Sequence, residues 1–232
     1  MKYIGHLDIM RYFQKAIRRS GLPIKYSEGF NPHQIMSFAA PLGVGITSDG
    51  EYMDIELKEF VPSKEAQERL QDTMVEGMEI ASFRYLPDNA QNAMSSVTAA
   101  SYLLSYKHPD EFPYTITELQ ASKKAFFDDA GIIPIIKKTK KGERELDLKP
   151  LIYDFNISEV CNSCGDSSIL FSLVVSTGST DNIKPELVLE HFFKHLGKED
   201  LGRYDFFIHR KDMLTGEVGQ FVSLGEIGDD KE

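Results

Sequence analysis

The sequence predicts an α+β protein of two ferredoxin-like βαββαβ domains with mainly antiparallel sheets, the second carrying an extra hairpin. Strand and helix patterns follow the order β-α-β-β-α-β within residues 1–86, and this order returns in residues 97–213 with one added hairpin. The polar, turn-rich stretch PDNAQNAMSS at residues 87–96 is expected to be a linker. A chain of 232 residues is long enough for two domains, and residues 214–232 are expected to form a flexible tail.

The first helix is predicted from the spacing of its apolar residues. Met1–Ile4 is expected to be the end of a strand, and Asp8 is a residue type that caps helix N-termini. Gly21 and Pro23 are expected to end the helix. Its apolar side chains lie within about 120° of one another on a helical wheel: Ile9, Met10, Phe13, Ala16 and Ile17.

Four further elements complete the first domain. Gln34–Ala39 has the continuous apolar pattern of a short buried strand. Glu51–Leu57 alternates between apolar and polar residues, which is typical of a strand with one buried face. A helix is predicted from Pro62 to Gly77, and Met78–Tyr85 is expected to be the last strand.

The second domain is predicted to repeat this plan. Its helices are expected at Thr115–Asp128 and Pro185–Leu196, and the second has proline at a permitted first-turn position. The added hairpin is expected over Ile132–Lys137 and Glu143–Leu148. The four remaining strands are Val97–Tyr106, Leu151–Ile157, Ser168–Ser176 and Tyr204–Arg210.

Charge is distributed unevenly along the chain. The whole sequence carries a net charge of −10, but residues 1–35 hold six basic residues against two acidic ones, a net charge of +4. Four of these cations lie within about 100° of one another, opposite the apolar stripe of the first helix: Arg11, Lys15, Arg18 and Arg19. A cationic face on an otherwise acidic protein indicates a local surface for an anionic partner.

The segment YSEGFNPH, residues 26–33, follows this helix and has the composition of a binding loop. Gly29 and Pro32 restrict its backbone, yet a purely structural turn does not require the aromatic, amide and imidazole groups beside them. Aromatic faces can stack on bases, amides can bond base edges, and nearby cations can bind phosphates. The predicted RNA-contacting residues of this loop are Tyr26, Phe30, Asn31 and His33.

Residues 3–57, YIGHLDIMRYFQKAIRRSGLPIKYSEGFNPHQIMSFAAPLGVGITSDGEYMDIEL, closely resemble a bacterial radical-SAM-linked family. GHLD, RR, YSEGFNPH and PLGVG occur in the order typical of that family, a domain of unknown function fused to, or encoded beside, a radical-SAM protein. The resemblance implies a radical-SAM partner and RNA-related work, and it implies no catalytic residues. Family members carry some further residues before this stretch, so the first strand is expected to be incomplete.

The chain is not expected to be the radical enzyme itself. That chemistry typically needs three closely spaced cysteines for its iron–sulfur cluster, and this sequence has only Cys161 and Cys164. A structural zinc site would need a second pair of ligands. We therefore predict no metal and no cofactor. No apolar run approaches the roughly 18 residues of a membrane span, and the start lacks a signal peptide, so a cytoplasmic location is expected.

The function predicted from these observations is an accessory module that binds RNA or another anionic polymer and serves a radical-SAM partner. A binding role is favoured over an enzymatic one, and two alternatives stay open. The first is a metal-independent RNA-modifying or RNA-cleaving enzyme that uses His6 or His33 as acid or base. The second is a protein-interaction domain whose basic helix docks on an acidic partner.

Overall fold

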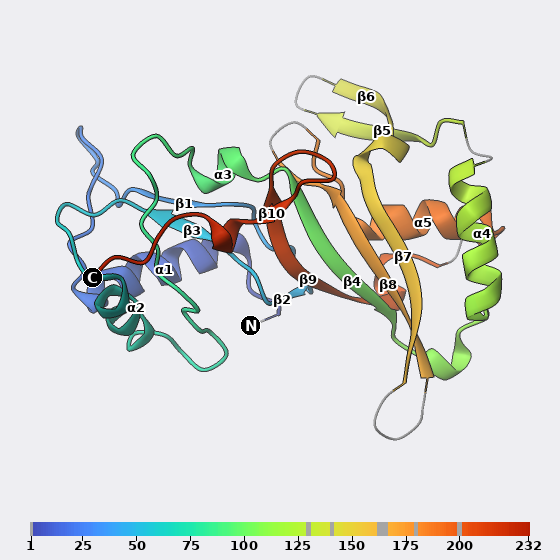
Figure 1. The fold of residues 1–232 in the computed structure, drawn as a ribbon, viewed down its shortest axis with the longest axis horizontal. Helices are drawn as coiled ribbons and strands as arrows, with labels where there is room; N and C mark the ends of the chain where they lie inside the picture. Colours follow the sequence, from blue (N-terminus) through green and yellow to red (C-terminus); the bar gives the residue numbers. More distant parts are fainter. Residues whose placement is uncertain (1, 129–130, 140–141, 162–166, 179–180, 199–200) are drawn as a thin grey trace. The chain divides into compact units, whose positions relative to one another are not determined.

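The computed structural model describes residues 2–128, 131–139, 142–161, 167–178, 181–198 and 201–232. The fold is α+β, as predicted, with antiparallel strand pairs and helices (Figure 1). The chain divides into two compact units. Unit 1 comprises Met1–Val97 and Met213–Glu232, and unit 2 comprises Thr98–Asp212. Over the described ranges, the helices are too short or too polar to cross a bilayer.

Unit 1 combines short strands with three helices. Strands β1 and β3 pair antiparallel, with Ser37 opposite Asp54. The helices are α1 (His6–Ser20), α2 (Ser63–Gln71) and α3 (Ala93–Ser96). The strands are β1 (Met36–Phe38), β2 (Thr47–Ser48), β3 (Met53–Ile55) and β10 (Val222–Ser223).

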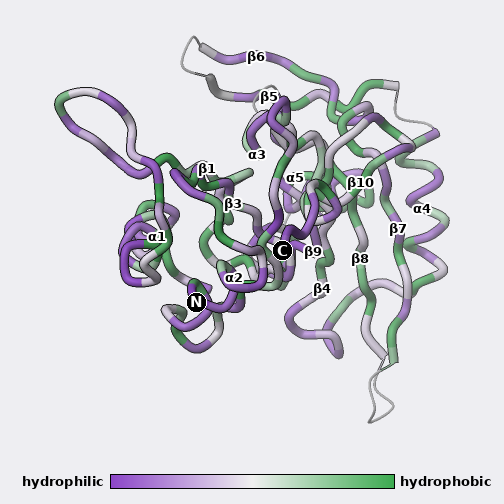
Figure 2. The backbone as a smooth tube through the Cα atoms, turned by 60° about the vertical axis from the view of Figure 1, so that its left-hand side comes forward, coloured by the Kyte–Doolittle hydropathy of each residue, from purple (hydrophilic) through white to green (hydrophobic). Residues whose placement is uncertain are grey.

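Helix α1 begins earlier than the sequence pattern predicts. The backbone N–H groups of Asp8 and Ile9 donate to the Gly5 carbonyl at 3.0 and 3.1 Å, so the first turn already forms around Gly5. Asp8, predicted as the capping residue, therefore lies inside the first turn, and Gly5 occupies the cap position without a side-chain hydrogen bond. The predicted apolar stripe is present, because Ala16 and Ile17 are fully buried. Figure 2 shows hydrophobic and hydrophilic residues interleaved along this helix.

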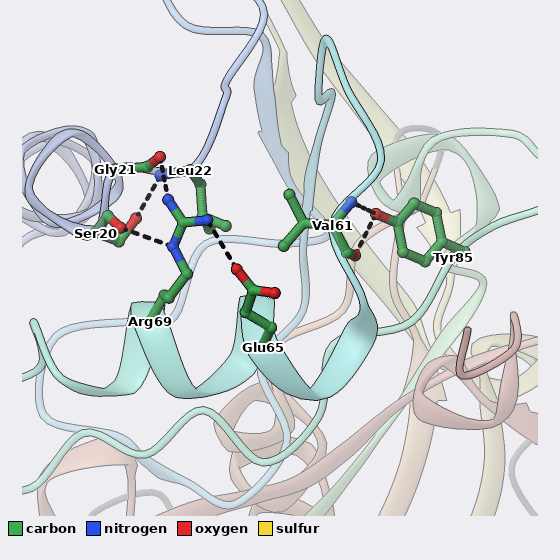
Figure 3. Close-up of polar contacts among 7 residues, drawn as sticks. All are labelled: Ser20, Gly21, Leu22, Val61, Glu65, Arg69 and Tyr85. Atoms are coloured by element: carbon green, nitrogen blue, oxygen red, sulfur yellow. Dashed lines mark hydrogen bonds and ion pairs between the residues drawn. The ribbon is translucent and has the colours of Figure 1, made fainter. Parts of the chain in front are cut away.

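The C-terminal end of α1 is held by a side chain of α2 (Figure 3). Gly21 adopts a φ of +67°, the left-handed conformation that commonly ends helices. Arg69 of α2 donates to the Ser20 carbonyl at 3.1 Å and to the Gly21 carbonyl, and it also pairs with Glu65 at 3.3 Å. A cation beside unpaired helix carbonyls complements the helix dipole. This contact fixes the point where the chain leaves α1.

Helices α1 and α2 share one hydrophobic core in unit 1. The apolar face predicted for Glu51–Leu57 is confirmed, since Met53, Ile55 and Leu57 all pack against this cluster. The fully or nearly fully buried members are Ala16, Ile17, Leu22, Ile24, Val61, Ala66 and Leu70.

Two strands predicted for the first domain are not strands in unit 1. Lys2 and Tyr3 form a turn, and the Lys2 carbonyl accepts a hydrogen bond from the Gly45 N–H at 2.8 Å. Within Met78–Tyr85, the backbone of Ile80 bonds to amide side chains of α2: its N–H donates to Gln71 Oε1 at 2.7 Å, and its carbonyl accepts from Gln67 Nε2 at 2.8 Å. Backbone groups bound in this way are not available for a strand ladder. The four-stranded sheet predicted here is therefore not present in the described part of unit 1.

The last residues of the chain belong to unit 1 and pair with its earlier part, which the sequence did not predict. The Ser63 N–H donates to the Lys231 carbonyl at 2.8 Å, and Ser63 Oγ accepts from the Lys231 N–H at 2.9 Å. Tyr85 and Asp229 form an isolated antiparallel bridge. The Tyr85 hydroxyl contacts both backbone groups of Val61 (Figure 3). The contacts join residues that are distant in the sequence.

Unit 2 is built on a sheet in the order β9-β4-β8-β7. β4 pairs antiparallel with β8, and β8 with β7. A separate antiparallel hairpin of β5 (Pro134–Thr139) and β6 (Gly142–Asp147) is inserted before β7, as predicted. The other elements are β4 (Ala99–Tyr106), α4 (Ile116–Asp128), β7 (Ile152–Cys161), β8 (Ser167–Ser176), α5 (Pro185–His195) and β9 (Phe206–Thr215), whose last three residues belong to unit 1.

The core of unit 2 lies between this sheet and its two helices. Helices α4 and α5 contact each other, since the Phe126 and Phe192 ring centroids are 5.5 Å apart, and Figure 1 shows α5 behind the strands. Aromatic rings fill the space between them: the Phe155 and Phe192 ring centroids are 5.2 Å apart, and those of Phe171 and Phe193 are 5.8 Å apart. Such edge-to-face pairs add to the stability from burial. Strand residues alternate in burial, so the sheet has one covered face.

Candidate nucleic-acid interface

The loop between α1 and β1 is closed at its base by a short ladder of contacts. Tyr26 and Gln34 form an isolated antiparallel bridge. Above it, the Ser27 N–H donates to the His33 carbonyl at 2.8 Å, and the His33 N–H donates to Ser27 Oγ at 3.1 Å. Ser27 Oγ also lies 2.8 Å from His33 Nδ1. Gly29 adopts a φ of +111°, which only glycine adopts readily, so the turn at the tip depends on it.

Residues 28–33 of the closed loop are all exposed, and among the described residues Phe30 is the most exposed large hydrophobic one. In Figure 1 the loop is the blue segment that projects away from α1 and β1. Asn31 and His33 are exposed beside Phe30. A fully exposed phenylalanine at a loop tip adds nothing to the hydrophobic core. The loop therefore presents an aromatic face, an amide and an imidazole to the solvent.

Tyr26 has a different environment from Phe30. Its side chain is half-buried and packs against the hydrophobic core of unit 1. The Lys58 ammonium lies 5.8 Å from the centroid of its ring, within the range of a cation–π contact. Tyr26 thus anchors the base of the loop to the core.

The four cations predicted to form one face of α1 divide into two pairs. Lys15 and Arg18 are exposed and have no ion-pair partner within the residues that the structure describes. Arg11 Nη1 lies 3.3 Å from the Asp8 carboxylate. Arg19 Nη2 donates to the Thr73 carbonyl at 3.2 Å, so this side chain ties α1 to the turn after α2. Of these four cations of α1, Lys15 and Arg18 are consequently the two most available to phosphates.

Lys25, at the start of the loop, is neutralised by a neighbour. Its ammonium forms an ion pair with Glu56. The hydrogen bond to Glu56, followed by the charge of that carboxylate, raises the pKa of Lys25 above its ordinary value. Lys25 therefore stays charged at neutral pH but adds little net positive potential to the loop.

One buried polar residue at the base of the loop was not predicted from the sequence. Gln34 is 4% exposed, and neither its Nε2 nor its Oε1 has a hydrogen-bond partner in the structure. A buried amide without partners costs about 1–3 kcal/mol. Its only sequence signal is a polar residue at the start of an apolar run, which is also common at strand ends.

Comparison with protein families shows which family the chain belongs to. A family model matches residues 1–185, which include α1, the loop and most of unit 2 up to the first residue of α5. The chain belongs to this family, described as an uncharacterized protein conserved in bacteria (DUF2344). The search of curated proteins gave no match. The DUF2344 description attaches no activity to the family, so the functional argument rests on the geometry of the site.

The alternative function, an RNA-modifying or RNA-cleaving enzyme, needs a histidine that can reach RNA as an acid or base. His6 is half-buried and packs edge-on against Phe38, with ring centroids 5.4 Å apart. No hydrogen bond joins His6 to Asp8 among the described residues. His33 is exposed, and its Nδ1 is held by Ser27. Of the two histidines, only His33 is open to a large ligand.

The cysteine pair of the DUF2344 chain is described only in part. Cys161 is exposed at the end of β7, whereas Cys164 lies outside the described residues. Within those residues, no group of three or more histidine, cysteine, aspartate or glutamate side chains is placed to hold a metal ion.

Proposed function

We propose that this chain is an accessory RNA-binding module in which the loop of residues 26–33 and the free cations of α1 contact the RNA. The observation that carries the proposal is the full exposure of Phe30 at the tip of a closed loop. Stacking of a base on an aromatic ring contributes about 1–3 kcal/mol. Because the Ser27–His33 contacts already close the loop, little ordering is needed before a base can stack.

The two kinds of contact have separate roles in this proposal. Lys15 and Arg18 supply sequence-independent attraction to phosphates. Asn31 and His33 offer hydrogen bonds to base edges beside the stacking ring. Tyr26 holds the base of the loop against the hydrophobic core of unit 1.

The experiment that tests this function compares two exposed aromatic residues of unit 1. Phe30→Ala should weaken binding of a fluorescein-labelled oligouridine roughly ten-fold or more, without changing the salt dependence, because a stacking contact carries no charge. Tyr3→Ala is the matched control, since Tyr3 is 78% exposed and lies outside the loop. Equal affinities of the Phe30→Ala variant and the wild type would show that the loop does not contact RNA.

We further propose that the module serves a radical-SAM protein. The support is the resemblance of residues 3–57 to the radical-SAM-linked family, in which GHLD, YSEGFNPH and PLGVG occur in the same order. Affinity purification from the native cell, with identification of co-purified proteins and RNA, tests this partnership. Recovery of RNA without a radical-SAM protein would leave RNA binding in place and remove the proposed partner.

For unit 2 we infer a ferredoxin-like plan. Without the β5-β6 hairpin, its elements follow the order β4-α4-β7-β8-α5-β9, which is β-α-β-β-α-β. Numbered within the unit, the sheet order β9-β4-β8-β7 becomes 4-1-3-2. Proteins of many functions use this plan, so it supports RNA binding only by analogy.

A further inference from the structure

The sheet of unit 2 has a second face that its helices do not cover. Figure 1 shows α5 behind the strands and α4 beside β7, and no helix in front of the sheet. On the covered face, Leu104, Phe171 and Leu173 are 0–1% exposed. The residues that alternate with them are only partly buried, which is common where an antiparallel sheet faces water on one side.

The register of the strands defines what this open face presents. Three rows run across β4, β8 and β7, because directly paired residues point to the same side of a sheet. Six polar side chains (four hydroxyls, one amide and one carboxylate) share these rows with one valine and two leucines. The rows are Ser101–Val174–Asp154, Leu103–Ser172–Asn156 and Ser105–Leu170–Ser158.

Strand β9, which pairs with β4, adds an aromatic ring and positive charge to the same face. Phe206 lies in the core, so the residues that alternate with it, Phe207, His209 and Lys211, lie on the open side. The Phe207 side chain is 49% exposed. The Lys107 ammonium lies 5.8 Å from its ring centroid and also donates to the Tyr204 carbonyl, which fixes its position.

We propose that this open face is a second nucleic-acid surface, which binds single-stranded RNA with a base on Phe207 and phosphates near Lys107 and Lys211. Charge favours this ligand: Lys107 lies over the ring and Lys211 is four residues farther along β9 on the same side, whereas Asp154, the acid in the three rows, lies on β7, beyond β4 and β8. Serine and asparagine side chains in the rows can bond bases and 2′-hydroxyls. The lysine that lies over the ring is held in place before any ligand arrives, so the ordering cost is small.

This surface shares its ligand class with the proposed function but none of its residues. Each can therefore fail without the other.

The first test uses the full chain and a fluorescein-labelled oligouridine. Phe207→Ala should weaken binding roughly ten-fold or more at constant salt dependence. Lys211→Gln should lower the slope of log affinity against log salt by about 0.7. Ile132→Ala is the control, because Ile132 is 70% exposed and lies outside the sheet. Wild-type affinity in both the Phe207→Ala and Lys211→Gln variants would overturn the proposal.

A second test needs no variant and keeps the proposal testable if Phe207→Ala fails to fold. Acetylation of lysines in the wild-type chain should be reduced by RNA at Lys107 and Lys211, and unchanged at Lys64, whose side chain is 88% exposed. Protection of Lys15 alone would sink the second surface and leave the loop proposal in place. Protection of Lys211 without protection of Lys15 would support the second surface and contradict the proposed contact between α1 and the RNA. If Phe207→Ala splits a dimer while RNA affinity stays unchanged, the face binds a second copy of the chain and the proposal is wrong.

Discussion

Ser27 Oγ lies 2.8 Å from His33 Nδ1 and accepts a hydrogen bond from the His33 backbone N–H at 3.1 Å. One hydroxyl therefore holds the two ends of the loop that carries Phe30 together. Both residues are outside the core, and the contact adds little to global stability. Its effect is to restrict the loop before a ligand binds. The hydroxyl of Ser27 is therefore expected to affect affinity more than folding.

Ser27→Ala removes this closure and should weaken RNA binding several-fold, because the loop must then be ordered when the ligand binds. The thermal midpoint should change little, since Ser27 is not in the core. Fluorescence anisotropy and a thermal melt measure the two quantities. Ser27→Thr keeps the hydroxyl and is the control. Unchanged affinity in Ser27→Ala would show that the free loop is already rigid or that it does not bind.

The His33 side chain separates a binding module from an enzyme. His33→Gln should weaken RNA binding modestly, and the wild-type chain should return the RNA chemically unchanged after prolonged incubation. Gel electrophoresis and mass spectrometry of the recovered RNA measure this. Cleaved or modified RNA that is lost with His33→Gln, at retained affinity, would instead establish the acid–base role considered for this residue.

The exposed cations of α1 should be distinguishable by their salt dependence. Lys15→Gln and Arg18→Gln should each lower the slope of log affinity against log salt by about 0.7, because each removes one phosphate contact from a single strand. Arg19→Gln should instead lower stability with a smaller change in slope, since its guanidinium already bonds the Thr73 carbonyl. If all three variants changed the salt slope and the stability alike, the distinction between Arg19 and the two exposed cations would be wrong.

Most helices and strands could be predicted from patterns among neighbouring residues. The features that were not predicted depend on contacts between residues far apart in the sequence. The apolar stripe of α1 and the alternation of Glu51–Leu57 follow from residues near one another in the sequence, and both are present. The strand predicted at Met78–Tyr85 is absent because amide side chains of α2 bind the backbone of Ile80. No local signal indicates that Lys231 pairs with Ser63, 168 residues away.

The candidate site shows the same limit at the level of single residues. Tyr26 and Phe30 are both aromatic members of one motif, and composition alone gives them the same role. The structure separates them, because the Tyr26–Gln34 bridge holds Tyr26 against the core while Gly29 turns the chain outward before Phe30. Arg11 and Arg19 were likewise grouped with Lys15 and Arg18 by helical spacing, which says nothing of contacts to Asp8 or Thr73.

Gln34 offers a test of stability at the base of the loop. Gln34→Met keeps the unbranched shape of the side chain and removes two buried polar atoms that have no partner. The free energy of unfolding should rise by about 1–3 kcal/mol, as measured by urea denaturation. A loss of stability would show that a buried water or another group satisfies the amide.

Asp54 should make unit 1 less stable as the pH rises. Its Oδ2 accepts a hydrogen bond from the Ala93 N–H at 2.6 Å. Burial raises the pKa of this carboxyl above its ordinary value of 3.8, and the Ala93 hydrogen bond only partly opposes the shift. The folded state therefore binds the proton more tightly than the unfolded state. The stability from this group is fully present below the unfolded pKa and is lost as the pH rises through the folded pKa.

Asp54→Asn keeps an oxygen that can accept from Ala93 and removes the buried charge. We expect the variant to be more stable than the wild type at pH 7, with a difference that shrinks as the pH falls toward 4 and the wild-type carboxyl takes up its proton. Urea denaturation across this pH range measures the difference. Asp88→Asn, at an exposed position, is the control for the change in net charge. A gain that is constant with pH, or equal in the control, would mean that the burial of Asp54 does not determine the effect.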